Sequence, residues 1–210
     1  MPQLILILTA LINILFYLLY QHYKRIKGCP QACAVSLKII PVLCSACLAA
    51  YGAIETGTTG YWLLCAGIFV CMAADWVIDY HLVPGMGIFA IGHIAYCTGF
   101  MLLSSPTGYN LLIFSAVFIP FLWLYHYFFK KKGVHQQPVL FLCYAVLLCI
   151  MVGLASSQKI MLFVGGICFA ISDGMLGWRM IKNVHSKLYD NLCMGLYYLA
   201  QYLIAASTLI

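Results

Sequence analysis

The segment Gly60-Tyr-Trp-Leu-Leu-Cys-Ala-Gly-Ile-Phe-Val-Cys-Met-Ala-Ala-Asp75-Trp-Val-Ile-Asp79-Tyr80 decides the fold class of this chain. It is long enough to cross a hydrocarbon core as a helix, which takes about 20 apolar residues. A charge at the bilayer centre costs about 3 kcal/mol or more, so it persists mainly where it faces a protein interior or a wet cavity. The segment therefore predicts a membrane helix that contributes carboxylates to an interior site.

The composition of the whole chain agrees with that interpretation. Hydrophobic residues make up 65% of the 210 residues, charged residues 8%, and the mean hydropathy is +1.00. Soluble domains carry about 25% charged residues, so this chain has too little polar surface for a water-soluble fold. A chain of this length predicts one all-α domain, residues 1–210, built as a polytopic membrane helix bundle.

Breaks at glycine, proline and charge clusters divide the chain into eight predicted transmembrane helices. These are Leu4–Tyr20, Ala34–Ala53, Gly60–Tyr80, Gly85–Leu103, Leu111–Phe129, Val139–Ser156, Ile160–Arg179 and Leu192–Leu209. Basic residues gather after the first, fifth and seventh spans, where nine of the eleven Lys and Arg residues lie. By the positive-inside rule these loops are cytoplasmic, and both termini are on the extracytoplasmic side.

The net charge of +6 is therefore assigned to topology and to membrane lipid headgroups, and no nucleic-acid partner is expected. We expect a multi-pass protein of the cell membrane. The cysteines are mostly inside apolar spans, where they are typical packing residues, and no metal or other cofactor is predicted. Nothing in the sequence specifies an oligomeric state.

Asp75 and Asp79 are four residues apart and share one helical face. Asp75 is a candidate functional residue, and the alternative is a structural ion pair with Lys38, a few residues into the second span. Asp79 lies at the end of its span, where it can also simply face water. Because the third and seventh spans run in the same direction, Asp75 and Asp173 are both expected in the cytoplasmic half, sharing a cavity that opens to the cytosol.

Asp173 follows Ser172 within the seventh span. Its alternative role is an interhelical hydrogen bond, since Ser and Asp often link membrane helices. His93 and Tyr96 share a face of the fourth span, and we expect His93 to face Asp75 from that neighbouring helix. A histidine in an apolar span can also be an ordinary buried residue.

Tyr197, Tyr198 and Gln201 can direct hydrogen bonds from the eighth span into one pocket, although bundle packing explains them nearly as well. The sequence has no Gly-x-Ser-x-Gly, His-Glu-x-x-His or phosphate-loop motif. If the chain is a hydrolase, acid–base chemistry is favoured over a covalent acyl intermediate.

An ordered set of motifs resembles the YhhN family, the lysoplasmalogenase family, over essentially the whole chain. The motifs are Lys38 with Pro41, Ala74-Asp75-Trp-Val, Gly85-Met-Gly-Ile-Phe89-Ala-Ile-Gly-His93-Ile-Ala-Tyr96, Ser172-Asp173 and Tyr197-Tyr198-Leu-Ala-Gln201. Two positions depart from the family pattern: Ala74 stands where Gly is usual, and Lys38 is separated from Pro41. The resemblance implies a lysophospholipid substrate and hydrolysis of the vinyl-ether bond of lysoplasmalogens, giving a fatty aldehyde and glycerophosphoethanolamine or glycerophosphocholine.

The candidate residues suit that reaction. Vinyl ethers cleave by protonation on carbon, so the site needs a neutral carboxylic acid, and removal from water favours that form. It also needs an anion to stabilise the oxocarbenium ion, as paired carboxylates do in glycosidases. Our hypothesis is that Asp75 and Asp173 divide these roles, that His93 and Tyr96 align the acid or the water, and that Lys38 binds the phosphate or acts on Asp75.

Two other classes of function use similar residues. An alkene isomerase or another lipid ether hydrolase also protonates a carbon–carbon double bond. A non-catalytic lipid-binding protein or a proton-coupled transporter can use buried aspartates to couple protons to movement, although we find no clear internal repeat of the kind common in transporters.

Overall fold

The computed structural model describes residues 2–26, 30–127, 138–182 and 186–210, and its regular elements there are all helical. The helices are α1 (Pro2–Tyr23), α2 (Gln31–Thr56), α3 (Thr59–Ile78), α4 (Leu82–Leu103), α5 (Gly108–Tyr125), α6 (Pro138–Ala155), α7 (Ile160–Lys182) and α8 (Lys187–Ala206). The predicted all-α class is confirmed. Five residues used in the sequence interpretation lie outside the described residues, namely Lys27, Phe129, Lys130, Lys131 and Lys132.

Helix ends differ from the predicted spans where polar residues continue or stop a helix. α8 begins at Lys187 and not at the predicted Leu192. Residues 187–191 form the first turn of this helix, although they are too polar to belong to a predicted apolar span. α2 ends where Gly57 adopts φ +64°, and the Gly57 N–H donates to the carbonyl of Ala53. A left-handed residue of this kind is a common helix terminator and favours glycine. Hydropathy thus marks the apolar part of each helix, while local capping sets its end.

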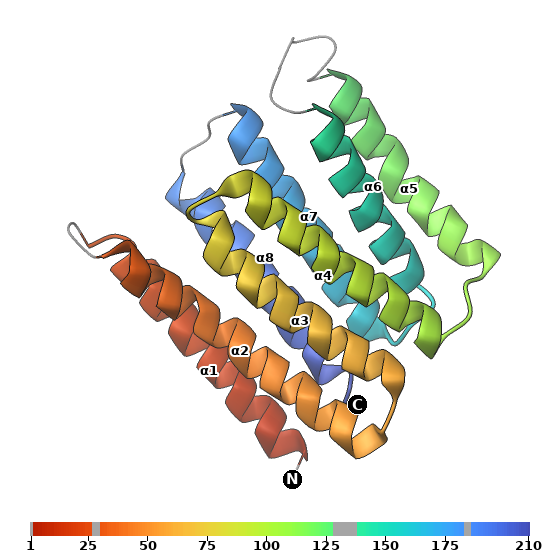
Figure 1. The fold of residues 1–210 in the computed structure, drawn as a ribbon, viewed down its shortest axis with the longest axis horizontal. Coiled ribbons are helices and arrows are strands. Elements are labelled where there is room, and N and C mark those ends of the chain that lie inside the picture. The colour runs from red at the N-terminus through yellow and green to blue at the C-terminus, as the bar shows by residue number, and fades with distance from the viewer. Residues whose placement is uncertain (1, 27–29, 128–137, 183–185) are drawn as a thin grey trace.

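Six of the helices form a closed ring. α2, α3, α4, α6, α7 and α8 pack against one another in that order, and α8 returns to pack against α2. α1 packs on the outside of this ring against α2 and α8, and α5 packs against α6. Figure 1 shows α1 and α5 at opposite edges of the bundle. The interior of the six-helix ring is therefore the one place that many helices can reach together.

Small residues bring α3 and α4 close together inside this ring. A Cβ atom added to Gly92 would lie 2.7 Å from the Cys71 sulfur, and one added to Gly67 would lie 2.5 Å from Cε1 of Tyr96. Any side chain at these positions would push the two helices apart. Close approach through small residues is the usual packing device of membrane helices. It presses the face of α4 that bears Gly92 and Tyr96 against α3.

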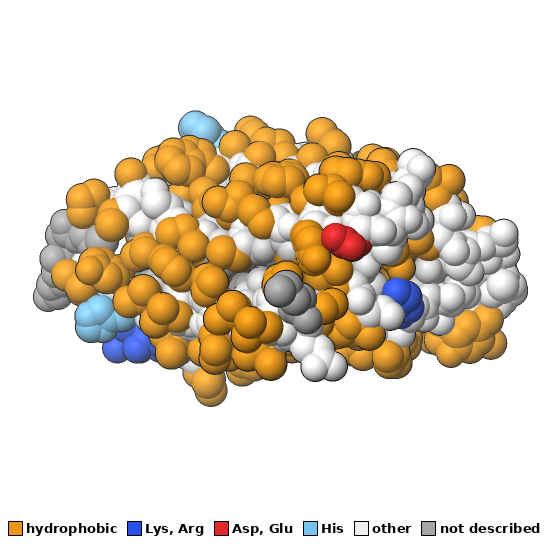
Figure 2. Space-filling model, turned by 90° about the horizontal axis from the view of Figure 1, so that it is seen from below, with side chains coloured by type: hydrophobic (Ala, Val, Ile, Leu, Met, Phe, Trp, Pro, Cys, Tyr) orange, Lys and Arg blue, Asp and Glu red, His pale blue; other side chains and the backbone are white. Residues whose placement is uncertain are grey.

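The surface of the bundle is apolar. The exposed large side chains of α1 include Leu4, Ile7, Leu11 and Leu15, each more than half exposed. Figure 2 shows a face covered mostly by hydrophobic side chains with few charges among them. Among the described residues, five helices are long and apolar enough to span a membrane, namely α1, α2, α3, α4 and residues Ile160–Arg179 of α7. The chain is a membrane protein, and crossing by all eight helices stays a prediction.

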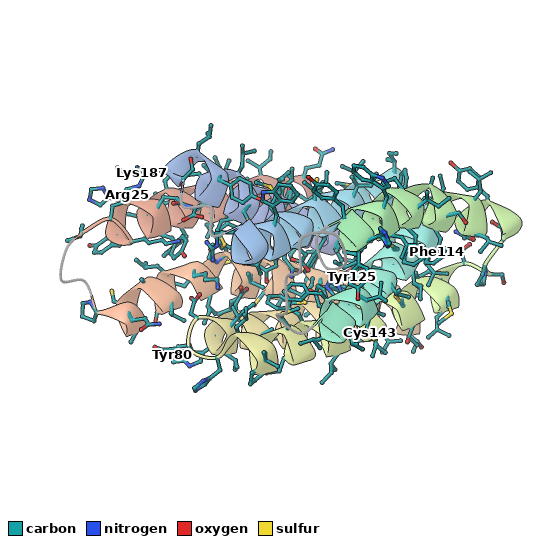
Figure 3. The ribbon with its side chains drawn as sticks, turned by 90° about the horizontal axis from the view of Figure 1, so that it is seen from above. Arg25, Tyr80, Phe114, Tyr125, Cys143 and Lys187 are labelled. Carbon is teal, nitrogen blue, oxygen red and sulfur yellow. The ribbon has the colours of Figure 1, made fainter. Side chains whose placement is uncertain are left out.

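Described basic residues that follow α1 and α7 lie at one end of the bundle. Arg25 and Lys187 lie there together with Tyr80, which follows α3 (Figure 3). Both chain termini lie at the opposite end (Figure 1). This arrangement is the one that the loop charges predict, and the side of the membrane that each end faces stays a prediction.

Candidate active site

A buried ammonium group lies between two carboxylates where α2 meets α3. Lys38 Nζ is 3.2 Å from Asp75 Oδ1 and 3.3 Å from Asp79 Oδ1. The side chains of Lys38 and Asp75 are 5% and 3% exposed, whereas Asp79 is 31% exposed. The ion pair between Lys38 and Asp75, considered above as a structural alternative, is present, and Asp79 joins it instead of only facing water. Two carboxylates and one ammonium leave this cluster with one excess negative charge.

Helix α8 extends the Asp75 cluster by a chain of hydrogen bonds. The Tyr197 hydroxyl donates to Asp75 Oδ2 at 2.5 Å, and Gln201 Nε2 donates to the Tyr197 oxygen at 3.2 Å. Gln201 Oε1 in turn accepts from the Tyr96 hydroxyl at 2.8 Å. Tyr96 and Gln201 are fully buried, and each polar group linked in this hydrogen-bond network has another protein group as its partner. Of the three eighth-span residues that the sequence analysis grouped, Tyr197 and Gln201 take part in this network.

Tyr198 does not take part in that hydrogen-bond network. Its hydroxyl donates to the backbone carbonyl of Lys38 at 2.9 Å, and its ring packs edge-on against Tyr17 of α1 at 6.0 Å. These contacts join α8 to α2 and α1. Tyr198 therefore positions the backbone that carries Lys38 and does not reach the carboxylates.

The second cluster lies where α4, α6 and α7 meet. His93 Nε2 is 3.3 Å from Asp173 Oδ2 and 3.0 Å from the Tyr144 hydroxyl, which also donates to Asp173 Oδ2. His93 is fully buried and Asp173 is 8% exposed. The expectation that His93 faces Asp75 was wrong. The partner of His93 is Asp173, because the face of α4 that carries His93 packs toward α6 and α7.

Tyr144 is the residue that sequence reasoning missed. Its only sequence signal is a single hydroxyl in the middle of an otherwise apolar span, Phe141-Leu-Cys-Tyr144-Ala. Such a hydroxyl needs a partner inside the membrane, so a lone mid-span tyrosine is a reason to look for one. The partner is on another helix, and the spacing within one helix does not identify it.

Aromatic rings separate the two clusters. The Phe169 ring lies 4.7 Å from His93 and 5.4 Å from Tyr197, centroid to centroid and edge to face in both cases. Phe89 packs against both Phe169 and Tyr197. Phe169 is fully buried. Asp75 and Asp173 therefore have different partners, and no hydrogen bond joins them among the described residues.

Ser172 is engaged in a helix contact. Its hydroxyl donates to the carbonyl of Cys193 at 2.8 Å, and the Cys193 thiol donates to the carbonyl of Ser172 at 3.3 Å. This reciprocal pair joins α7 to α8 next to Asp173. We assign Ser172 to positioning, because its hydroxyl is already used by the backbone of the neighbouring helix.

Both carboxylates line a common opening, which we call the charged cleft. It contains about 750 Å³ of empty space, its open mouth included. Its charged lining residues are Lys24, Lys38, Arg179, Asp75, Asp79, Asp173 and Asp190. The two aspartates thus share one cavity, as the sequence predicted. Near the mouth, Asp190 pairs with Arg179 at 3.0 Å and with Lys24 at 3.6 Å.

A second opening, which we call the apolar groove, lies between α5, α6 and α7 with α3 and α4 at its base. It contains about 990 Å³ of empty space, its open side included. Its walls include Val117, Phe121, Tyr125, Phe141, Leu148, Ala170, Gly174, Gly177 and Trp178. Asp173 is the one charged residue among its lining residues.

Asp173 lines the charged cleft and the apolar groove alike, and so do Ile78, Phe89 and Leu176. Asp173 therefore lies where a polar compartment and an apolar compartment adjoin. No group of three or more His, Cys, Asp or Glu side chains in the described part of the chain is arranged to hold a metal ion. The chemistry that the described residues offer at this junction is proton transfer and electrostatic stabilisation of a positive charge.

The fold and this interior site define a helical membrane protein with acid–base groups inside its bundle. Comparison with known families identifies it further: the model of the YhhN family matches residues 33–208, and the chain belongs to that family. The chain is 32% identical to lysoplasmalogenase TMEM86B of Homo sapiens over 184 residues, which covers 84% of this chain and 75% of the human protein. No solved structure matches the chain significantly.

Proposed function

We propose that this protein hydrolyses the vinyl-ether bond of lysoplasmalogens. The observation that carries the proposal is the position of Asp173 at the junction of the charged cleft and the apolar groove. The name of its human relative, a lysoplasmalogenase, supports the same activity. A lysoplasmalogen has its vinyl-ether group between a charged glycerophospho headgroup and one hydrocarbon chain, so a head in the cleft and a chain in the groove bring that group to Asp173.

The reaction begins with transfer of a proton from a carboxylic acid to carbon. We assign this acid to Asp173, which protonates the vinyl-ether carbon remote from oxygen and leaves an oxocarbenium ion at the other carbon. Asp173 contacts a hydroxyl and an imidazole through Oδ2 and lines the apolar groove, so its carboxyl group lies where the substrate chain would meet it. Asp75 accepts from an ammonium group and a phenol, a geometry that suits a carboxylate.

Water completes the hydrolysis. It attacks the oxocarbenium carbon and returns a proton to the Asp173 carboxylate, giving a hemiacetal. A proton then moves from the hemiacetal hydroxyl to the glycerol oxygen, the carbon–oxygen bond breaks, and the aldehyde and the glycerophospho compound leave. His93 and Tyr144 contact the acid at Oδ2 and are assigned to hold it in position and to relay protons.

The Asp75 cluster is assigned an electrostatic role. The cluster lines the cleft, and its excess negative charge stabilises the cationic intermediate. Of the two roles divided between the carboxylates, stabilising this cation is the one that we assign to Asp75. Lys38 is fully engaged by Asp75 and Asp79, so we assign headgroup phosphate binding to Lys24 and Arg179 at the cleft mouth instead.

The proposal is tested with purified protein, a lysoplasmalogen and its saturated ether analogue. We expect aldehyde from the first and none from the second, because only the vinyl ether can accept a proton on carbon. In D₂O the aldehyde, trapped by reduction, should carry one deuterium on the carbon next to the carbonyl. Deuterated lipid without aldehyde would indicate an isomerase, and uptake without any product would indicate a transporter; either result would refute the proposal.

We also propose that all eight helices cross the cell membrane with both termini on the extracytoplasmic side. The gathering of Lys24, Arg25, Arg179 and Lys187 at one end of the bundle supports this topology. The charged cleft would then open toward the cytoplasm. Alkaline phosphatase fused after Ile210 should be active, while a fluorescent protein that folds only in the cytoplasm should be dark at the same position; the reverse result would invert the topology.

A further inference from the structure

Two glycines on α7 leave one wall of the apolar groove without side chains. A Cβ atom added to Gly174 would meet nothing within 4 Å, and this residue is exposed although it directly follows Asp173, whose side chain is only 8% exposed. One turn later, a Cβ added to Gly177 would lie in ordinary contact with Phe141, at 3.5 Å. Unlike Gly67 and Gly92, these glycines are therefore not required for helix packing. Their effect is to keep space open beside the acid.

The groove has an open side between α5 and α7. α5 packs closely against α6, and within the described residues its backbone has no comparable contact with α7. Val117, Phe121 and Tyr125 nevertheless face the same groove as Gly174. Tyr125, at the end of α5, is labelled in Figure 3. An opening between α5, which lies outside the ring, and α7 of the ring faces the lipid rather than the water at either end of the bundle.

We propose that this groove binds the hydrocarbon chain of a single-chain lipid, that the lipid enters sideways between α5 and α7, and that Gly174 sets which chains fit. The assignment of the polar end rests on the proposed function; the binding of the chain does not. The occupant must be an amphiphile, because the groove is apolar along its length and adjoins the charged cleft at Asp173.

The first test fills the groove. Gly174→Leu places a side chain in open space, so the fold should tolerate it. Hydrolysis of a substrate with a 16-carbon alkenyl chain should fall about tenfold or more relative to one with a 6-carbon chain, a discrimination within reach of a hydrophobic pocket. Ala116→Leu is the matched control, since Ala116 is exposed on α5 beside Val117 and does not line the groove. An unchanged ratio between long and short chains in folded Gly174→Leu would overturn the proposal.

The second test measures binding without hydrolysis. In a variant that keeps Trp178 and replaces Trp62, Trp76 and Trp123 by Phe, a saturated-ether lysolipid with a brominated chain should quench the remaining fluorescence saturably. Gly174→Leu should abolish the saturable part and Ala116→Leu should keep it. Quenching that depends on Gly174 in a protein without hydrolase activity would uphold the groove and refute the proposed reaction. Quenching that is absent, or the same in Gly174→Leu, would refute the groove as the chain site.

A variant that enlarges the groove guards against misfolding of Gly174→Leu. Phe121→Ala removes a large side chain from the α5 wall and leaves α7 unchanged. It should move the preferred chain toward longer or bulkier chains by about tenfold in relative kcat/KM. The parent preference in this variant would overturn the role of the groove.

Discussion

Two buried carboxylates on neighbouring parts of one bundle have opposite surroundings. Asp75 accepts from the Lys38 ammonium at 3.2 Å and from the Tyr197 hydroxyl at 2.5 Å. Asp173 contacts the Tyr144 hydroxyl and His93, and it lines an apolar groove. Both are nearly inaccessible, with exposed fractions of 3% and 8%. Burial alone therefore does not distinguish them; their partners do.

The difference indicates how a membrane bundle can pair one carboxylate with a cation and place another beside a groove that could hold a substrate. A built-in cation offsets the cost of burying Asp75 as an ion. Asp173 has no built-in Lys or Arg among the ion pairs of the described residues, and its partners are a phenol and an imidazole. A group of that kind can give a proton to a substrate that enters from the adjoining groove. On this comparison we propose that Asp75 is an electrostatic and structural residue and that Asp173 is the catalytic one.

The largest expected effect is that of Asp173→Asn. This change removes the transferable proton and keeps the shape of the side chain, so aldehyde release should fall by about 10³-fold or more, in line with the weight of general acid catalysis. Thermal unfolding in detergent should stay close to that of the parent. Asp75→Asn is the comparison variant, and its folded fraction should keep more activity than Asp173→Asn. The opposite order would exchange the roles of the two aspartates.

The largest effect on the free energy of unfolding is expected from breaking the ion cluster of Lys38, Asp75 and Asp79. Lys38→Met leaves Asp75 and Asp79 without their cation, and breaking a buried pair typically costs about 3–5 kcal/mol. Asp75→Asn should cost less, because Lys38 keeps Asp79. Lys38→Met combined with Asp75→Asn should recover part of the loss. The free energy of unfolding in mixed micelles measures all three, and a Lys38→Met variant as stable as the parent would contradict the structural role of the cluster.

The sequence predicted the fold through the length and apolarity of its helices. It also gave an ion pair between Asp75 and Lys38 as one alternative, and it predicted Tyr197 and Gln201 as hydrogen-bonding groups of the eighth span. It grouped Tyr96 with His93, whereas the Tyr96 hydroxyl donates to Gln201. It did not predict the partner of His93 or the role of Tyr144. His93 and Tyr144 are 51 residues apart and meet only because α4 packs against α6 in the ring.

The order of helices around the ring is what a single sequence leaves open. Periodicity indicates the face on which a residue lies, but which helix that face meets depends on the packing of the whole bundle. Phe169 and Gly174 illustrate this limit. An apolar ring and a glycine in an apolar span have no distinctive pattern, yet one separates the two carboxylate clusters and the other opens the groove.

Two tyrosines provide a matched test of this comparison, with expected effects smaller than that of Asp173→Asn and larger than that of Lys24→Gln. Each donates to a buried aspartate, Tyr144 to Asp173 and Tyr197 to Asp75. Tyr144→Phe should lower kcat by about 10–100-fold, the effect of removing a hydrogen bond of about 1.5–3 kcal/mol from the reacting acid. Tyr197→Phe should act mainly on unfolding stability and leave kcat within about threefold. Equal losses of kcat in the two variants would mean that both clusters serve the chemical step directly.

The smallest effect is expected at the mouth of the charged cleft. Lys24 pairs with Asp190 at 3.6 Å, and its side chain is 40% exposed. An exposed ion pair contributes about 0–1 kcal/mol, so Lys24→Gln should barely alter unfolding stability. If Lys24 binds the phosphate, KM should rise a few-fold while kcat is unchanged, and added salt should reduce the difference between variant and parent. A loss in kcat with constant KM would place Lys24 in the chemistry, and no change in either constant would remove it from the headgroup site. Glu55→Gln, outside the cleft, is the control for a change of surface charge alone.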